Sequence, residues 1–166
     1  MIRVLSPGEM GDPKLVELLV ATVNAGASVS FVAPLSQEAA SSYWLSVAEQ
    51  VARGERIVLA TDDLTGCIHL VLATQPNGLH RAEVQKMLVH PAARRQGLGR
   101  SLLAAAEAHA RTIGRTLLVL DTEQGSAGED LYRACGWQRV GTIPDFALNG
   151  AGTALIPTVF FYKLLS

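Results

Sequence analysis

Cysteines, long apolar runs and charged residues are all scarce in this chain, and each scarcity excludes a class of protein. The two cysteines, Cys67 and Cys135, lack the spacing of a metal site and do not suggest a disulfide framework, which is typical of a reducing cytoplasm. No apolar run approaches the roughly 20 residues of a membrane span. The first residues also lack the apolar segment of a signal peptide. We therefore expect a cytoplasmic protein with no membrane association and no bound metal.

Charged residues make up only 17% of the chain, whereas hydrophobic residues make up 49%. A formal net charge of −1 argues against a general affinity for nucleic acid, so a local basic cluster would serve one small anion. The 166 residues suffice for one substantial core, and no repeat, low-complexity tract or linker divides them. The sequence predicts a single domain over residues 1–166.

A basic stretch with two glycines, residues 90–101, stands between a predicted strand and a predicted helix. The first N–H groups of a helix have no internal acceptor, and the helix dipole places partial positive charge there. Gly97 and Gly99 lack the Cβ that would hold a phosphate away from the backbone. Full positive charge comes from Arg94, Arg95 and Arg100. The stretch predicts a pyrophosphate site, and the alternative is a solvated helix start with scattered arginines.

Hydrophobic periodicity and turn residues predict the remaining elements. Apolar spacing favours helices from Pro13 and Ser36, with Trp44, Leu45 and Val51 of the second helix facing inward. We interpret residues 26–34, between them, as a loop near the site. Further helices are expected at 99–113 and 130–137, and strands at 2–5, 56–61, 67–74, 81–89, 116–121, 139–143 and 158–164.

The basic stretch does not match the common phosphate loops. A Walker loop needs Gly-Lys-Ser/Thr at its end, but Arg100 follows Gly99 here. A dinucleotide fingerprint needs a third small residue where Leu102 stands. What remains, Arg94-x-x-Gly97-x-Gly99 after a Val-x-Pro strand end, resembles the acetyl-CoA loop of the GCN5-related N-acetyltransferases (GNAT).

A second segment, Tyr132-x-x-x-Gly136-Trp137, resembles another signature of that family. The predicted order of elements is also the family's. The resemblance implies an α/β (α+β) GNAT fold, with one mixed, mainly antiparallel sheet of about seven strands and helices on both faces. It also implies an acetyl-CoA-dependent N-acetyltransferase, with a homodimer as one expected assembly.

Residues 77–86, together with 120–123, are similar to the tabtoxin-resistance acetyltransferases within this family. Those enzymes acetylate a β-lactam amino-acid toxin. The resemblance therefore implies a small amino-acid-like acceptor, including a toxin or antimetabolite. It leaves open whether the role is detoxification or ordinary metabolism.

Two carboxylates are candidates for removing the proton from the acceptor ammonium, whose pKa is near 10. Glu83 lies in the strand that leads to the basic stretch, and Asp121 ends the strand expected beside it. Both should lie where these strands diverge. From the residues alone, Glu83 also fits a solvated residue on a strand, and Asp121 also fits a cap for the next helix. The resemblance implies that these are the two catalytic acids.

The resemblance also implies that Tyr132 protonates the departing CoA thiolate, although from the residues alone it is equally a core aromatic. Backbone N–H groups near the end of the preceding strand are the expected donors to the thioester oxygen, and those of the loop the expected donors to pyrophosphate. The predicted acetyl-CoA-binding residues are Met87, Leu88, Val89, Arg94, Arg95, Gln96, Gly97, Leu98, Gly99, Arg100 and Ser101.

Other interpretations stay open. His80, His90 and His109 are alternative bases, and Cys67 and Cys135 are alternative acetyl carriers that direct transfer does not require. Weaker candidates for the acceptor pocket are Ser28, Phe31 and Arg81. The function could also be acetylation of a protein or peptide, or CoA binding by a sensor without catalysis.

Overall fold

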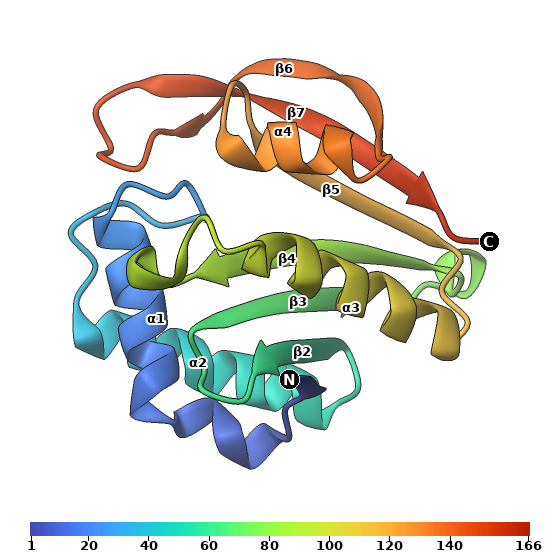
Figure 1. The fold of residues 1–166 in the computed structure, drawn as a ribbon, viewed down its shortest axis with the longest axis horizontal. Helices are drawn as coiled ribbons and strands as arrows, with labels where there is room; N and C mark the ends of the chain where they lie inside the picture. The colour runs from blue at the N-terminus through green and yellow to red at the C-terminus, as the bar shows by residue number, and fades with distance from the viewer.

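The computed structural model describes residues 1–166 and is built on a seven-stranded sheet (Figure 1). The strand order is β1-β2-β3-β4-β5-β7-β6, and every neighbouring pair is antiparallel except β4 and β5. This is the mixed, mainly antiparallel sheet that the sequence predicts. The strands are β1 (Ile2–Val4), β2 (Arg56–Thr61), β3 (Gly66–Leu72), β4 (Arg81–Val89), β5 (Leu117–Glu123), β6 (Gln138–Leu148) and β7 (Leu155–Leu164).

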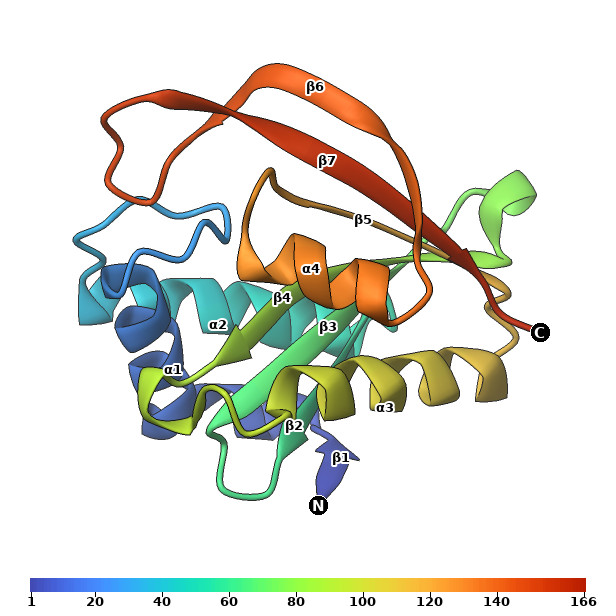
Figure 2. The same ribbon diagram turned by 45° about the horizontal axis from the view of Figure 1, so that its top comes forward.

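Helices cover both faces of the sheet, as Figure 2 shows. One face packs on α3 (Leu98–Thr112) and α4 (Ala127–Ala134), and the other packs on α1 (Pro13–Asn24) and α2 (Gln37–Ala52). We call these the α3 face and the α2 face. Short 3-10 turns occupy Pro7–Gly11, Pro76–Gly78 and Pro91–Ala93. No helix is both long and apolar enough to cross a membrane.

The first two helices begin where their capping residues predict. Asp12 accepts the N–H of Lys14 at 2.8 Å, and Pro13 follows it as the first helical residue. Ser36 caps α2 through the N–H of Ala39 at 3.1 Å. Capping side chains satisfy N–H groups that a helix cannot satisfy internally, which is why these two starts could be read from the sequence.

Three expectations about these elements need correction. Leu45 does not face inward, because the buried stripe of α2 is Ala40, Trp44 and Val47, and Leu45 lies about 100° around the helix from Trp44. Helix α4 begins at Ala127, three residues before the expected start, because Ser126 supplies its cap. The last two strands are longer than predicted, since mutual pairing extends them into a hairpin.

Two irregularities shape the middle of the sheet. Strands β4 and β5 pair only from Arg81 to Glu83 with Leu117 to Val119, so the β5-facing edge of β4 has no strand partner beyond Glu83. The β3–β4 register also shifts. Cys67 pairs with Leu88 and His69 pairs with Gln85, so β4 has one residue more than β3 between these two pairs. Lys86, with φ +47°, lies in this bulge.

Trp44 is the largest fully buried side chain, and its Nε1 donates to the Leu15 carbonyl at 2.8 Å. We expect Trp44→Ala to lower the free energy of unfolding by about 3–5 kcal/mol, because it leaves a cavity and removes the hydrogen bond to the Leu15 carbonyl. Urea unfolding followed by circular dichroism measures this. The neighbouring control, Leu45→Ala, removes a side chain that is 60% exposed and should cost less than about 1 kcal/mol. Equal losses would contradict the assigned inner face of α2.

Candidate active site

The loop between β4 and α3 presents a run of free backbone N–H groups. No N–H from Arg95 through Arg100 donates to a protein acceptor, and the first such bond beyond them is Ser101 N–H to the Gly97 carbonyl at 3.1 Å. Gly97, the N-cap of α3, has φ +79°, and Arg95 has φ +61°. Successive N–H groups in such a turn, at the positive end of a helix dipole, form an anion-binding concavity.

Arginine side chains surround this loop and extend into solvent. Arg94, Arg95 and Arg100 are all exposed, and only Arg94 makes a contact with the protein, from Nε to the Val89 carbonyl at 3.4 Å. His90 is occupied locally, because its Nδ1 accepts the Ala92 N–H at 3.2 Å. The predicted loop residues therefore lie together, with unpaired N–H donors and exposed positive charge available to an anion.

The two predicted carboxylates lie on the α2 face of the sheet. Ala82 and Val84 belong to the core under α3, so Glu83 between them faces the other way. Glu83 pairs in register with Val119, and Asp121 stands two residues further along β5 on the same face. Glu83 is thus the last paired residue before β4 and β5 separate, and Asp121 lies just beyond. The expected placement of both residues at the divergence is confirmed.

Asp121 is held by a neighbouring strand and caps no helix. Its Oδ2 accepts from the Thr158 hydroxyl of β7 at 3.0 Å, while Ser126 caps α4 through the N–H of Glu129 at 3.2 Å. Glu83, by contrast, makes no hydrogen bond within the protein, so both of its oxygens are free to accept. The capping interpretation of Asp121 is therefore wrong.

Tyr132 lies on the opposite, α3 face of the sheet. Its ring packs 5.8 Å from Trp137 and 6.1 Å from Phe161 between ring centroids. Its hydroxyl makes no hydrogen bond within the protein. Burial raises the pKa of the Tyr132 phenol above its usual value near 10, and the negative charge of Asp121 adds to this. The ring is thus a core aromatic, and the phenol remains a free, protonated donor.

A polar cluster, which the sequence analysis missed, continues the α2 face from the two carboxylates. It consists of Arg56, His69, Gln85 and Lys86, with Tyr43 of α2 above it. Because the bulge adds one residue, Lys86 projects to the same face as Gln85 rather than alternating away from it. The available signal was two consecutive polar residues, Gln85 and Lys86, in a strand that otherwise alternates.

Hydrogen bonds connect this cluster to the bulge. Arg56 Nη1 donates to His69 Nδ1 at 2.9 Å, which leaves the His69 proton on Nε2, 3.9 Å from Cys67 Sγ. Cys67 in turn donates to the Lys86 carbonyl, with Sγ and O 3.8 Å apart. Burial lowers the pKa of His69 well below its usual value and raises that of Cys67 to about 12. Both side chains are therefore neutral, which fits a structural role.

The wall beyond this cluster is formed by two segments that are distant in the sequence. The loop between α1 and α2 meets the β6–β7 turn, where the Ala33 N–H donates to the Gly150 carbonyl at 2.8 Å. A Cβ at Gly150 would lie 2.6 Å from the Gly26 carbonyl oxygen, so only glycine permits this approach. Figure 2 shows the hairpin tip above this loop. Phe31, a predicted pocket residue, belongs to this wall, whereas the Arg81 guanidinium lies beside Gly78 at the other end of β4.

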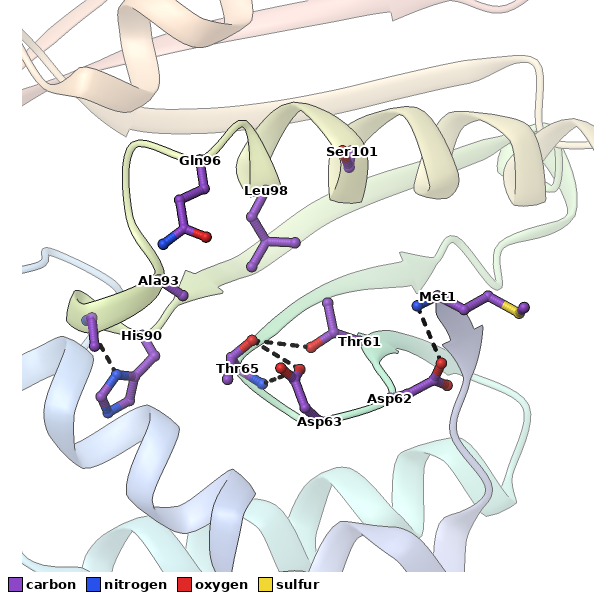
Figure 3. Close-up of a pocket in the computed structure, with 11 residues that line it drawn as sticks. Met1, Thr61, Asp62, Asp63, Thr65, His90, Ala93, Gln96, Leu98 and Ser101 are labelled. Carbon is purple, nitrogen blue, oxygen red and sulfur yellow. Dashed lines mark hydrogen bonds and ion pairs between the residues drawn. The ribbon is translucent and has the colours of Figure 1, made fainter.

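A pocket of about 590 Å³ lies on the outer side of the basic loop (Figure 3). Gln96, Leu98 and Ser101 line one side of it, and the β2–β3 turn with Asp62 and Asp63 lines the other. Those two carboxylates would repel a diphosphate, and none of Glu83, Asp121 and Tyr132 lines this pocket. The two predicted carboxylates lie instead where β4 and β5 separate.

Residues 39–139 match the family model of the acetyltransferase (GNAT) domain. Solved structures share the fold across the whole chain. The ribosomal-protein-alanine N-acetyltransferase of Brucella melitensis is 20% identical with a TM-score of 0.79, covering 99% of each chain. A candidate acetyltransferase of Salmonella typhimurium, solved with its cofactor acetyl-CoA, is 20% identical with a TM-score of 0.80, covering 100% of this chain and 94% of its own.

A candidate phosphinothricin N-acetyltransferase is 16% identical, with a TM-score of 0.76, and covers 100% of this chain and 98% of its own. These similarities between structures concern the fold, while the family model spans more than half of this chain and includes both the basic loop and Tyr132. On that match, and with a sheet whose strands part beside a loop of free N–H groups, the chain belongs to the GNAT acetyltransferases.

Proposed function

We propose that this protein transfers the acetyl group of acetyl-CoA directly to the amine of a small amino-acid-like acceptor. The proposal depends on one observation: the sheet separates the candidate proton acceptors from the candidate proton donor. Glu83 and Asp121 face one side of the separation between β4 and β5, and Tyr132 lies on the other side. A proton acceptor and a proton donor on opposite sides of one opening are what acyl transfer from a thioester to an amine requires.

The residues of the basic loop fit acetyl-CoA. The free N–H groups from Arg95 through Arg100 would bind its pyrophosphate, and the exposed arginines would neutralise the remaining charge. The β4 edge at Met87, Leu88 and Val89 has no partner on the β5 side, so an N–H there would donate to the thioester oxygen as negative charge develops. Acetyl-CoA supplies the activated acetyl group.

The carboxylates would prepare the acceptor. At pH 7 an amine with a pKa near 10 is almost entirely protonated and has no lone pair for attack. Transfer of one ammonium proton to Glu83, directly or through water, frees that lone pair. Asp121, fixed by Thr158, would hold the ammonium group beside Glu83. The new C–N bond then forms as the C–S bond breaks, and the second proton of the amine passes through water to the departing CoA thiolate, which leaves as the free thiol.

Tyr132 would stabilise the departing sulfur. Because the pKa of this phenol is raised, its proton is less acidic than that of a thiol, whose pKa is about 8.5. A hydrogen bond from the phenol to the developing thiolate is therefore favoured over complete proton transfer early in the step. This refines the expectation of a simple general acid.

The acceptor side favours a small molecule. The contact between the α1–α2 loop and the β6–β7 turn closes one end of the α2 face, which favours a small acceptor over a peptide that would extend past this end. The fold itself does not choose, since its neighbours include proteins named for a ribosomal protein and for phosphinothricin. We propose an amino-acid-like acceptor, in the class of the tabtoxin-resistance substrates.

We also propose that residues 1–166 act as one catalytic domain in the cytoplasm. The sheet that holds the site includes β1, near the first residue, and β7, near the last, so both ends of the chain contribute to it. Cys67 and Cys135 are free thiols, which suits a reducing compartment.

Acetyl-CoA turnover tests the proposal. Release of free thiol should depend on amino acids, their amides or β-lactam amino-acid analogues, with the acetylated amine detected by mass spectrometry. Turnover with peptides alone would instead indicate a protein or peptide acetyltransferase. Calorimetric binding of CoA with no acetylation of any amine would replace the proposal with a CoA-binding sensor.

A further inference from the structure

Two cations on the α2 face, the buried Arg56 and the half-buried Lys86, have no anionic partner. Arg56 is only 8% exposed, and its hydrogen bonds go to neutral groups, with Gln50 Oε1 at 2.6 Å from Nε and His69 Nδ1 at 2.9 Å from Nη1. Every ion pair of the chain involves other residues, so neither Arg56 nor Lys86 lies within 4.0 Å of a carboxylate oxygen. Removing an unpaired charge from water is costly, and Arg56 is removed from water almost completely and Lys86 in part.

The Lys86 ammonium is held in place but is not saturated. Its Nζ donates to Ser30 Oγ at 2.9 Å and lies 5.8 Å from the Phe31 ring centroid and 6.0 Å from that of Tyr43. An ammonium has three N–H donors, and the protein accepts only one of them. The two rings meet edge to face, 5.2 Å apart, and fix the position of the charge.

Tyr43 adds a second unsatisfied donor. Its hydroxyl is buried and has no hydrogen-bond partner, which is uncommon for a buried phenol. Arg56 is near enough for its charge to favour the ionised phenol, although the hydrogen bonds of its guanidinium go to Gln50, His69 and Gln85. Burial raises the pKa of Tyr43 to about 12, so at neutral pH this hydroxyl keeps its proton.

The charges around Lys86 define what can bind. Burial and the neighbouring Arg56 lower the pKa of the Lys86 ammonium to about 8, while Glu83 and Asp121 oppose this shift. At pH 7 the group is still mostly protonated. An anion near Lys86 would complete its hydrogen bonds and neutralise the pair of cations, whereas the two carboxylates on the same face would attract an ammonium.

We propose that the acceptor carries a carboxylate, and that Lys86, Ser30 and Tyr43 bind this carboxylate while Glu83 and Asp121 bind the amine. The inference rests on the proposed function and narrows it to acceptors in which an amino group and a free acid lie a few atoms apart. The bulge in β4 makes this possible, because it places a cation and a carboxylate on one face within a single strand.

Matched acceptors test the inference by turnover. The parent should prefer amino acids to their uncharged amides, and Lys86→Met should lower that preference in kcat/KM by roughly ten- to a hundredfold, the worth of a hydrogen bond to a charged group. The surface control Lys14→Met should keep the parent's preference. An unchanged preference in Lys86→Met, or a parent that prefers the amides, would overturn the inference even if acetylation occurs.

A binding measurement separates this inference from the proposed function. In an NMR titration, acetate should shift the ring resonances of Phe31 and Tyr43 in the parent, acetamide should not, and Lys86→Met should lose the response. This result would support the anion site even if no amine were acetylated. Equal responses to acetate and acetamide would refute it. Lys86→Arg, which keeps the charge, should retain part of the acetate response, and the dispersed spectrum of Lys86→Met itself would show that this variant is folded.

Discussion

Tyr132→Phe is expected to lower kcat for acetyl transfer roughly a hundredfold, in the range for removing one donor to a developing charge. The substitution removes only the hydroxyl, which makes no hydrogen bond within the protein. The ring contacts with Trp137 and Phe161 remain, so the urea midpoint should not change. Calorimetry should give the parent's affinity for CoA, since the basic loop is untouched. Steady-state thiol release with the best acceptor measures the effect on kcat.

The matched control is Tyr162→Phe, which removes a hydroxyl from an exposed tyrosine on β7. Its kcat should equal that of the parent. If Tyr132→Phe also keeps kcat within about threefold, a hydrogen bond to the leaving sulfur is not part of catalysis. The tyrosine would then be a core residue only.

The second large effect is expected at Glu83. Replacing it with glutamine should lower kcat/KM at pH 7 by about a hundred- to a thousandfold, because general base catalysis is worth that much. Asp121→Asn should cost less, about tenfold, because an asparagine can still accept the Thr158 hydroxyl and part of the binding role persists. Turnover of the same acceptor by each variant gives both values.

The pH dependence identifies the role of the proton acceptor. Above the acceptor's pKa the amine is already neutral, so the deficit of Glu83→Gln should shrink as the pH rises toward 10. Asp130→Asn, at an exposed carboxylate of α4, serves as the control and should match the parent throughout. A deficit that is independent of pH would show that Glu83 positions the acceptor and does not take its proton.

Local signals in the sequence predicted most of the fold. Asp12-Pro13 and Ser36 located helix starts because capping is a short-range interaction between neighbours in sequence. Leu45 was placed wrongly, because the inner face of α2 depends on which side meets the sheet, and that is a tertiary property. The full lengths of β6 and β7 were also missed, since pairing between the two strands, and not their composition, extends them.

The same distinction between local and tertiary signals applies to the site. The basic loop could be found because its glycines and arginines are contiguous in the sequence. The prediction that Glu83 and Asp121 lie close together needed the strand order, which the family resemblance implied and the structure confirms. Arg56, Tyr43 and Lys86 come from three separate elements, and only the folded structure shows that they form one cluster. Single-sequence periodicity does not report such long-range burial, so this cluster went unnoticed.

The extra residue in β4 reverses the face on which odd-numbered and even-numbered side chains of the strand lie. Up to Gln85, odd-numbered side chains lie over α2 and even-numbered ones over α3; from Lys86 onward the assignment is reversed, as the opposite surroundings of Leu88 and Val89 show. The face on which a β4 side chain lies therefore depends on which side of the bulge it occupies, and one alternation cannot be applied to the whole strand. Deleting Lys86 would remove the extra residue and leave Gln85, Met87, Leu88 and Val89 on their present faces by plain alternation. Deleting a residue outside the bulge, where the strand alternates, would instead exchange the faces of the residues beyond it.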